Sequence, residues 1–379
     1  MRNITKIISL FLTLVMLCSC IVGCGIGRKK KESENTLFPN GLLAVQVGDK
    51  WGYVNKKGEM VIDPQFDFAY KFSDGLAAVE VNEKWGYINT KGKMVIEPEF
   101  DSAYKFADGL AIVCVDGKYG YIDTKGKYVI DPQFDTIGDF KDGLAIVYVD
   151  GKYGYVDTKG EYVVDPQFEG ATNFSEGLAV VYVDGKWGYI DTTGEYVIDP
   201  QFDYSSGFSD GLAVVCVDSK YGYINTTGEY VIELKFDFVS NFSDGLARVS
   251  VDGKYGYIDT TGEMVIEPQF EFVSNFSGGL ARVLVGEKYG YINTKGEMVI
   301  EPQFDHALDF SDGFASVEVD SKYGYINTKG KYIIEPKFYS ESSFSDGFAI
   351  VCEDGKYGVV DEDGDFVVEL IYDFIIGFN

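Results

Sequence analysis

Histidine is almost absent from this chain, which has one, His306, among 379 residues. A zinc cluster built on histidines needs a second one, and a catalytic triad would have to run through His306 alone. Serine and aspartate residues like those near His306 recur at many other places in the sequence. No single position is therefore marked as a catalytic centre, and we expect a protein that is not an enzyme and has no cofactor.

Basic residues are also scarce, since 33 Lys and Arg stand against 60 Asp and Glu, for a net charge of −27. Residues 38–379 hold 27 of the basic and 58 of the acidic residues, a net of −31. Nucleic-acid binding needs a basic surface, so the composition excludes it. The acidic stretch 361–365 invites a calcium interpretation. Ca²⁺ takes about six to eight oxygen ligands, however, and Asp-Gly pairs are common in turns without metal, so we expect no metal site.

Helical periodicity is missing outside the N-terminus, where no apolar pattern of helical spacing avoids a glycine. A strict 34-residue repeat is present instead. An aromatic-Gly pair recurs every 34 residues without insertion, starting at Trp51, Trp85, Tyr119, Tyr153, Trp187, Tyr221, Tyr255, Tyr289, Tyr323 and Tyr357. Residues 38–377 thus contain ten repeats. Helical repeats of the same length are rejected, because each internal Gly would cost a helix about 1 kcal/mol.

Each repeat is rich in Val, Ile and Tyr and predicts three antiparallel strands, at 178–183, 187–191 and 195–199 in the fifth repeat. Asp184-Gly185 is typical of a tight hairpin turn, and 191–194 of a turn with Asp first and Gly fourth. Pro200 lacks an amide donor and should end the third strand.

Alternation along the first strand predicts one packed face, with Ala179 and Val181, and one face that is free to vary. We expect Gly188 to make room for a large ring from a neighbouring strand. The connection 201–210 should be pinned to the core by Phe202 and Phe208, which recur in almost every repeat.

The phrase K-W-G-Y-I-[DN]-x-x-G-x-[MY]-V-I-x-P-x-F at 84–100 and 186–202 resembles the bacterial WG-repeat family, also called KWG repeats. The resemblance covers residues 38–377. It implies an all-β repeat domain on a secreted or surface protein and says little about activity. Seven of the ten repeats carry Tyr where the family has Trp, and Leu234 and Leu370 replace the proline.

A repeat of this size cannot bury its own face, so it must pack on its neighbours. We expect ten three-stranded meanders stacked as an open superhelical β-solenoid. The alternative is a β-propeller, whose blades usually have four strands in about 40–45 residues.

Residues 1–23 are typical of a lipoprotein signal peptide, with Arg2 and Lys6 before an apolar run that is short for a membrane span. The run ends at a segment that resembles a lipobox, which implies a lipid on Cys24; Cys20 is a weaker candidate, and an uncleaved anchor helix is the alternative. Residues 24–37 should form a polar flexible tether. We expect the array, 38–379, on the extracytoplasmic face of a bacterial cell membrane.

Three further cysteines, Cys114, Cys216 and Cys352, share one place in the repeat and lie three and four repeats apart. A disulfide needs Cα atoms within about 7 Å, so we expect three unpaired, partly exposed thiols.

The most variable part of the repeat is the four-residue segment before each recurring Phe, for example 204–207. Its aromatic members Tyr70, Tyr104 and Tyr204, together with His306, are the candidate ligand-facing residues. Two functions remain open: a module that binds a protein or polysaccharide, and a structural spacer of the envelope without a specific ligand.

Overall fold

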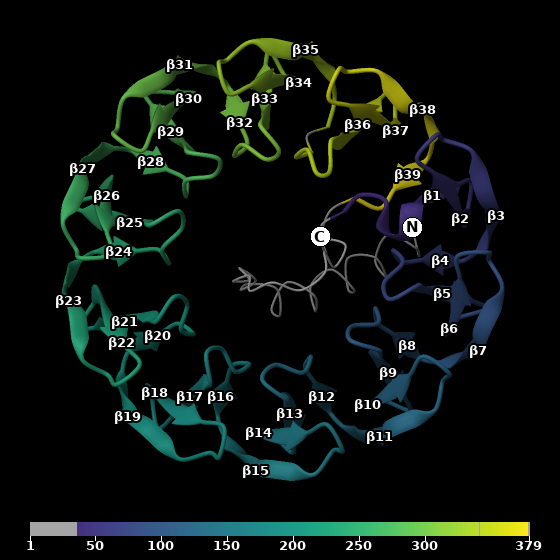
Figure 1. Cartoon of the computed structure of the whole chain (residues 1–379), viewed down its shortest axis with the longest axis horizontal. Coiled ribbons are helices and arrows are strands. Elements are labelled where there is room, and N and C mark those ends of the chain that lie inside the picture. Colours follow the sequence, from purple (N-terminus) through teal and green to yellow (C-terminus); the bar gives the residue numbers. More distant parts are fainter. Residues whose placement is uncertain (1–35, 341, 378–379) are drawn as a thin grey trace. The chain divides into compact units, whose positions relative to one another are not determined.

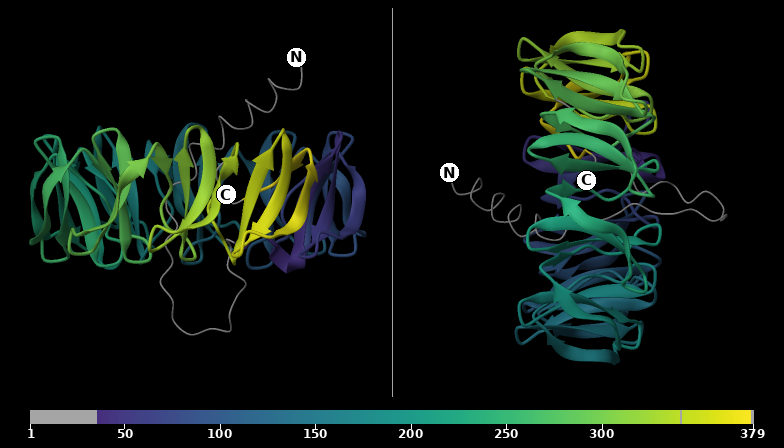
Figure 2. Two further views of the ribbon diagram at one scale, coloured as in Figure 1. Left: turned by 90° about the horizontal axis from the view of Figure 1, so that it is seen from above. Right: turned by 90° about the vertical axis from the view of Figure 1, so that its left-hand side faces the viewer.

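The computed structural model describes residues 36–340 and 342–377, which belong to one compact β-domain. These residues form nine four-stranded antiparallel sheets and one three-stranded sheet, arranged as the blades of a closed ring (Figure 1). Seen from the side, the ring is a single layer of blades (Figure 2). The expected all-β class is confirmed. The expected open solenoid of three-stranded meanders is wrong, and the fold is the alternative, a β-propeller with ten blades.

We number the blades 1 to 10 by the repeat that supplies their three long strands. The first long strands are β1 (Leu42–Val47), β5 (Leu76–Val81), β9 (Leu110–Val115), β13 (Leu144–Val149), β17 (Leu178–Val183), β21 (Leu212–Val217), β25 (Leu246–Val251), β29 (Leu280–Val285), β33 (Phe314–Val319) and β36 (Phe348–Glu353). The second are β2 (Lys50–Asn55), β6 (Lys84–Asn89), β10 (Lys118–Asp123), β14 (Lys152–Asp157), β18 (Lys186–Asp191), β22 (Lys220–Asn225), β26 (Lys254–Asp259), β30 (Lys288–Asn293), β34 (Lys322–Asn327) and β37 (Lys356–Asp361).

The third are β3 (Met60–Phe66), β7 (Met94–Phe100), β11 (Tyr128–Phe134), β15 (Tyr162–Phe168), β19 (Tyr196–Phe202), β23 (Tyr230–Phe236), β27 (Met264–Phe270), β31 (Met298–Phe304), β35 (Tyr332–Phe338) and β38 (Phe366–Tyr372). The short strands are β4 (Phe68–Ala69), β8 (Ser102–Ala103), β12 (Thr136–Ile137), β16 (Gly170–Ala171), β20 (Tyr204–Ser205), β24 (Phe238–Val239), β28 (Phe272–Val273), β32 (His306–Ala307) and β39 (Phe374–Ile375). A 3-10 turn, η1 (Pro39–Gly41), precedes β1. The described residues contain no helix that is long and apolar enough to cross a membrane.

The short strand is the element that turns a three-stranded repeat into a four-stranded blade. It comes from the variable segment of the preceding repeat and pairs with the first long strand of the next, as in the order β16-β17-β18-β19. Figure 1 shows the short strands toward the centre of the ring and the third strands on its perimeter. In nine of the ten blades, the chain segment that leads in from the blade before is therefore also an element of the sheet, which is why the connection is not a free loop.

The two turns of each repeat have the predicted geometry. In blade 5, Asp184 and Gly185 both have positive φ, 49° and 86°, as a tight hairpin with a two-residue turn requires. At the other end, the amide of Gly194 donates to the carbonyl of Asp191 at 3.0 Å, and the Asp191 side chain accepts from the amide of Thr193 at 2.8 Å. Both hairpins of the meander are thus set by local sequence.

The third strand runs through the proline instead of ending before it. In blade 5 it extends to Phe202, and the two-residue step from Trp187 to Tyr189 is matched by a four-residue step from Phe202 to Ile198. The extra residues form a bulge that holds Pro200. Because this strand is the outer edge of the sheet, a residue without an amide donor is tolerated there.

Every hydrophobic cluster of the core lies between two blades. One cluster joins Val180, Tyr189 and Ile198 of blade 5 to Val215 and Ile224 of blade 6. The other face of blade 5, with Ala179 and Val181, packs on blade 4 in the same way. The expectation of one packed and one freely varying face is therefore wrong, because Val180 is as fully buried as Ala179.

The ring closes through the last described residues. β39 pairs with β1, with Ile375 opposite Val45 and Phe374 opposite Gln46, and so supplies the inner strand that blade 1 would otherwise lack. A tenth cluster joins Leu43, Val45, Val54 and Ile375 of blade 1 to Ile350, Val359 and Val368 of blade 10. An open stack would leave this apolar surface in water, which is the physical reason for the closed ring.

A polar link, here called the clasp, connects neighbouring blades on the surface. In it, Lys186 of blade 5 lies 2.5 Å from the carboxylate of Asp203, whose other oxygen accepts from the amide of Asp218 in blade 6 at 2.8 Å. These contacts hold the pKa of the Asp203 carboxyl below its usual range. The same arrangement recurs at Asp67, Asp101, Asp135, Asp237, Asp305 and, across the closure to the amide of Gly48, at Asp373.

Candidate functional site

The four predicted ligand-facing residues lie at three separate places on the ring. Tyr70 in blade 2 is half-buried, and Tyr104 in the adjacent blade 3 is 38% exposed. Tyr204 in blade 6 is 47% exposed, and His306 in blade 9 is half-buried, edge-on to Tyr289 with ring centroids 5.7 Å apart. Only Tyr70 and Tyr104 are brought near one another. Cys24 lies outside the described residues.

The register of the blade decides which side chains surround these positions. In blade 2, Phe68 of the short strand lies opposite Glu80 of β5, which in turn lies opposite Trp85 of β6. These three places are cross-strand neighbours on one sheet face, next to the tight turn between the first and second long strands. Aromatic side chains at the places of Phe68 and Trp85 therefore lie on the same face of the sheet, close to this turn.

Aromatic residues at these places form a continuous row across the closure of the ring. The ring centroids are 5.2 Å apart for Tyr357 and Phe374, 6.0 Å for Phe374 and Trp51, and 5.1 Å for Trp51 and Phe68. The rings in this unbroken row, from blade 10 to blade 2, are Tyr357, Phe374, Trp51, Phe68, Tyr70 and Trp85. The contacting pair Tyr104 and Tyr119 of blade 3 comes next around the ring, and Tyr104 acts on the pKa of Tyr70. We call the row together with this pair the aromatic arc.

The arc combines a buried base with exposed rings. Trp51 and Trp85 are 4% and 8% exposed, whereas Phe374 is 43% exposed. Tyr70 stacks on Trp85, with centroids 5.1 Å apart and an interplanar angle of 25°. The tryptophans therefore pack as the repeat pattern indicated, and they also fix the orientation of more exposed aromatic rings.

One residue of the arc, Tyr70, and the lysine that follows it in the sequence have shifted pKa values. The pKa of the Tyr70 hydroxyl is raised, first by burial and then by the nearby Tyr104 hydroxyl and Glu80 carboxylate. The pKa of Lys71 is lowered to about 8, first by burial and then by repulsion from Lys105. Tyr70 and Tyr104 are thus electrostatic neighbours, as are the lysines that follow them, although they come from different blades.

Sequence reasoning found Tyr70 and Tyr104 but missed their partners. Phe68, Lys71 and Lys105 were not singled out, although the dipeptide Tyr-Lys occurs in the variable segment only at 70–71 and 104–105. That coincidence in two consecutive repeats was the available signal. The joining of blade 10 to blade 1, which adds Tyr357 and Phe374, had no signal in any single repeat.

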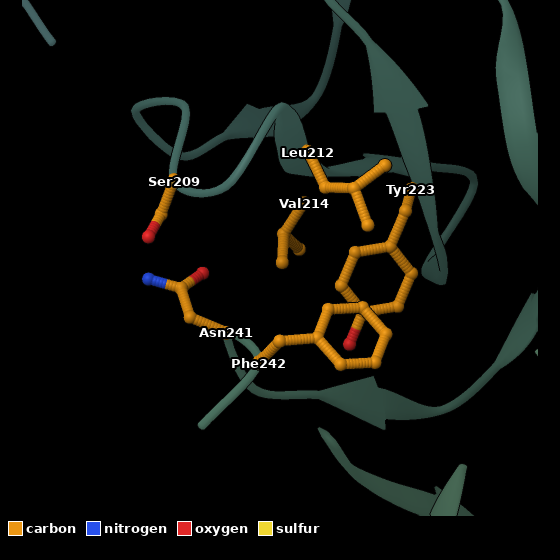
Figure 3. A pocket seen from close by; sticks show the side chains of 6 residues that line it. All are labelled: Ser209, Leu212, Val214, Tyr223, Asn241 and Phe242. Carbon is orange, nitrogen blue, oxygen red and sulfur yellow. The ribbon is translucent and has the colours of Figure 1, made fainter. Parts of the chain in front are cut away.

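Other candidate sites are weaker. A shallow hollow between blades 6 and 7 is lined by Ser209, Leu212, Val214, Tyr223, Asn241 and Phe242, and it leaves no room for even a water-sized molecule (Figure 3). Ligand pockets are typically about 300–1,000 Å³. In the acidic stretch 361–365, Asp361 accepts the amides of Asp363 and Asp365, as a turn requires.

The three repeat cysteines are unpaired but not partly exposed as expected. Cys114, Cys216 and Cys352 are free thiols with 5%, 4% and 8% exposure. Burial raises the pKa of Cys114 and Cys216. They occupy the face that was expected to vary freely, and it is buried because the next blade covers it.

Comparisons with known proteins identify the repeat. A family model described as WG containing repeat matches ten consecutive segments: 51–85, 85–119, 119–153, 153–187, 187–221, 221–255, 255–289, 289–323, 323–357 and 357–379. No curated protein matches the sequence.

Two solved structures show a partial likeness in fold. One is a eukaryotic initiation factor, with 13% identity, a TM-score of 0.49, and coverage of 77% of this chain and 94% of that chain. The other is BamB from Moraxella catarrhalis, with 16% identity, a TM-score of 0.36, and coverage of 68% and 89%. At scores this low, neither likeness carries an argument about function.

Proposed function

The chain belongs to the family of WG-containing repeat proteins, and we propose that it is a binding module that holds a glycan against the aromatic arc. The observation that carries the proposal is the unbroken series of ring contacts across blades 10, 1 and 2, with the Tyr104–Tyr119 pair of blade 3 beside it. In blade 6, by contrast, Tyr204 meets Tyr221 of its own blade, with centroids 6.2 Å apart.

The chemistry of the arc suits a sugar chain. Aromatic faces carry partial negative charge and attract the slightly positive C–H groups on the flat face of a pyranose. Tyrosine adds a hydroxyl that can bond to sugar hydroxyls. A row of rings along a rim offers successive places for successive sugars, and a polymer does not need the enclosed pocket that a small molecule needs.

A protein ligand is the alternative within the same class. Stable protein interfaces bury about 1,200–2,000 Å² in total. The arc presents its rings as one narrow row with buried tryptophans beneath, which favours an extended polymer over a folded partner.

The proposal is for a binding protein rather than an enzyme. The repeated carboxylates serve turns and clasps, as Asp191 and Asp203 do in blade 5. A structural spacer is the second candidate, and the observation that favours it is the repetition of these contacts around the ring.

We also propose that Cys24 carries a lipid that holds the propeller on the extracytoplasmic face of the membrane. The support is the signal-like segment 1–23 with its lipobox-like end. Cys24→Ser should move the protein from the membrane fraction to the soluble fraction; full retention, with no acyl mass on the N-terminal peptide, would contradict the anchor.

Tryptophan fluorescence offers a direct test of glycan binding, because two of the three tryptophans, Trp51 and Trp85, lie in the arc. Titration with soluble envelope polysaccharides should give a saturable change. Tyr104→Ala should weaken binding about tenfold, which corresponds to about 1.4 kcal/mol.

Tyr204→Ala is the matched control, since Tyr204 is more exposed but lies outside the arc. It should bind as the unchanged protein does. Saturable binding that falls equally in both variants would place the ligand elsewhere, and a complete lack of binding to any glycan would favour the spacer.

A further inference from the structure

One side-chain amide, that of Gln46, lies beside two rings of the aromatic arc at the closure of the ring. In blade 1, Gln46 of β1 lies opposite Phe374 of β39 on one side and opposite Trp51 of β2 on the other. Side chains at directly opposed places of neighbouring antiparallel strands share one face of the sheet, with Cβ atoms about 4.5–5.5 Å apart. The Gln46 amide is therefore placed next to two aromatic rings whose centroids are 6.0 Å apart.

Blade 1 differs chemically from the other blades at this place. A glutamine amide offers an N–H donor and a carbonyl acceptor side by side. The equivalent places in the other repeats carry no side-chain amide; they hold Glu80, Cys114, Tyr148, Tyr182, Cys216, Ser250, Leu284, Glu318 and Cys352.

The Gln46 amide is available to a ligand. Gln46 is half-buried, and within the described part of the chain its side chain forms no hydrogen bond. The side-chain amide of Gln65, in the outer strand of the same blade, donates instead to the carbonyl of Asp63 at 3.2 Å. Because a partly buried amide has lost some of its contact with water, a ligand that supplies both a donor and an acceptor is favoured there.

The charged groups around this amide do not favour an anionic ligand. Lys356 lies 2.5 Å from the carboxylate of Asp373, and Lys50 lies 2.6 Å from the carboxylate of Asp67, so both lysines are already paired. Asp49, in the exposed turn after β1, adds a negative charge. The domain as a whole has a net charge of −31, which repels anions. The place therefore suits a neutral polar group.

On the basis of the proposed function, we infer that the bound glycan contains N-acetylated amino sugars and that Gln46 binds the acetamido group of one of them. The Gln46 side chain donates to the acetamido carbonyl and accepts from the acetamido N–H, so both of its polar groups are satisfied at once. The acetamido methyl group packs against the ring of Phe374, which is 43% exposed. A sugar with a hydroxyl in place of the acetamido group has no methyl group for this contact and cannot pair with the amide in the same way.

The test compares two neutral pentasaccharides on the full chain by tryptophan fluorescence: chitopentaose, built of N-acetylglucosamine, and cellopentaose, built of glucose in the same linkage. Chitopentaose should bind at least about tenfold more tightly, which corresponds to about 1.4 kcal/mol. Gln46→Leu keeps the approximate size of the side chain and removes the amide. It should abolish the preference for chitopentaose and leave the affinity for cellopentaose unchanged.

Gln65→Leu is the matched control, because it makes the same change in the outer strand β3 of the same blade. It should leave both affinities unchanged, and circular dichroism should show that every variant is folded. An equal loss of chitopentaose binding in the two variants would overturn the inference, because the effect would then be general. A full preference for chitopentaose in Gln46→Leu would also overturn it.

The remaining outcomes separate this inference from the proposed function. If cellopentaose binds as tightly as chitopentaose, or if neither binds while an envelope polysaccharide does, the acetamido assignment fails and the proposed function stands. If no glycan binds, the proposed function itself fails.

Discussion

At the scale of single residues, Gly188 shows why a glycine follows the aromatic residue in every repeat. The cause differs from the one expected from the sequence. A Cβ atom at this position would lie 2.6 Å from the carbonyl oxygen of Ile198 and 2.6 Å from the nitrogen of Pro200. The expectation that a ring from a neighbouring strand lies over this glycine is therefore wrong. The bulge in the third strand brings main-chain atoms there, and the same close approach recurs at the aromatic-Gly positions of the other repeats.

Gly188→Ala should destabilise the protein by about 1–3 kcal/mol, as overpacking against main-chain atoms does. Gly207→Ala is the control, because the nearest atom to a Cβ there is the Cβ of Ser175 at 4.0 Å. It should change stability by less than about 0.5 kcal/mol. Urea unfolding followed by circular dichroism measures both, and equal midpoints for the two variants would show that the contact with Ile198 and Pro200 does not matter.

At the scale of elements, the strands and turns set by residues within one repeat could be predicted from the sequence. The short strand could not, because its pairing partner belongs to the next repeat. The first strand, 178–183, and both turns of the repeat are as predicted, because alternation and Asp-Gly chemistry are properties of adjacent residues. The short strand β16 has two residues and no common composition with its counterparts. Its hydrogen-bond partner, β17, belongs to the next repeat.

The same reasoning explains what could be predicted of the candidate site. Tyr70 and Tyr104 stand out because they are aromatic residues in a variable segment. Their neighbours on the arc come from other strands and, at the closure, from the opposite end of the sequence. Only the blade register places Phe68 beside Trp85, and only the pairing of β39 with β1 places Phe374 beside Trp51.

At the scale of the whole molecule, ten similar repeats produce a ring with one distinct place, between β39 and β1. Phe38 and Phe348 meet near it, with centroids 5.2 Å apart, and Asp373 accepts the amide of Gly48 at 2.7 Å. The structure joins the two ends of the array, and the variable segment of the tenth repeat supplies the inner strand of blade 1 through β39.

Ile375→Ala should lower stability by about 2–5 kcal/mol and open the closure, because Ile375 is 2% exposed in the cluster between blades 10 and 1. The readout is hydrogen exchange at the amide of Ile376, which donates to the carbonyl of Ala44 in β1 at 3.3 Å. Exchange at this amide should become faster, and the radius of gyration should grow.

Two controls separate closure from general damage. Ile371→Ala removes a side chain that is 61% exposed and should have little effect. Val239→Ala shortens the side chain at the equivalent place in β24, where the chain runs on into β25, and should leave the Ile376 amide protected. Faster exchange at the Ile376 amide in Val239→Ala would contradict a special role for the closure.

The shared strands also decide where the molecule can come apart. At nine of the ten boundaries between blades, the third strand of one blade continues along the chain into the inner strand of the next blade. This holds between β38 and β39 as well. The one break in covalent continuity around the ring lies within a sheet, between β39 and β1 of blade 1, and not between two blades. Under force or heat, the ring should open between β39 and β1, and each blade should keep its own three long strands.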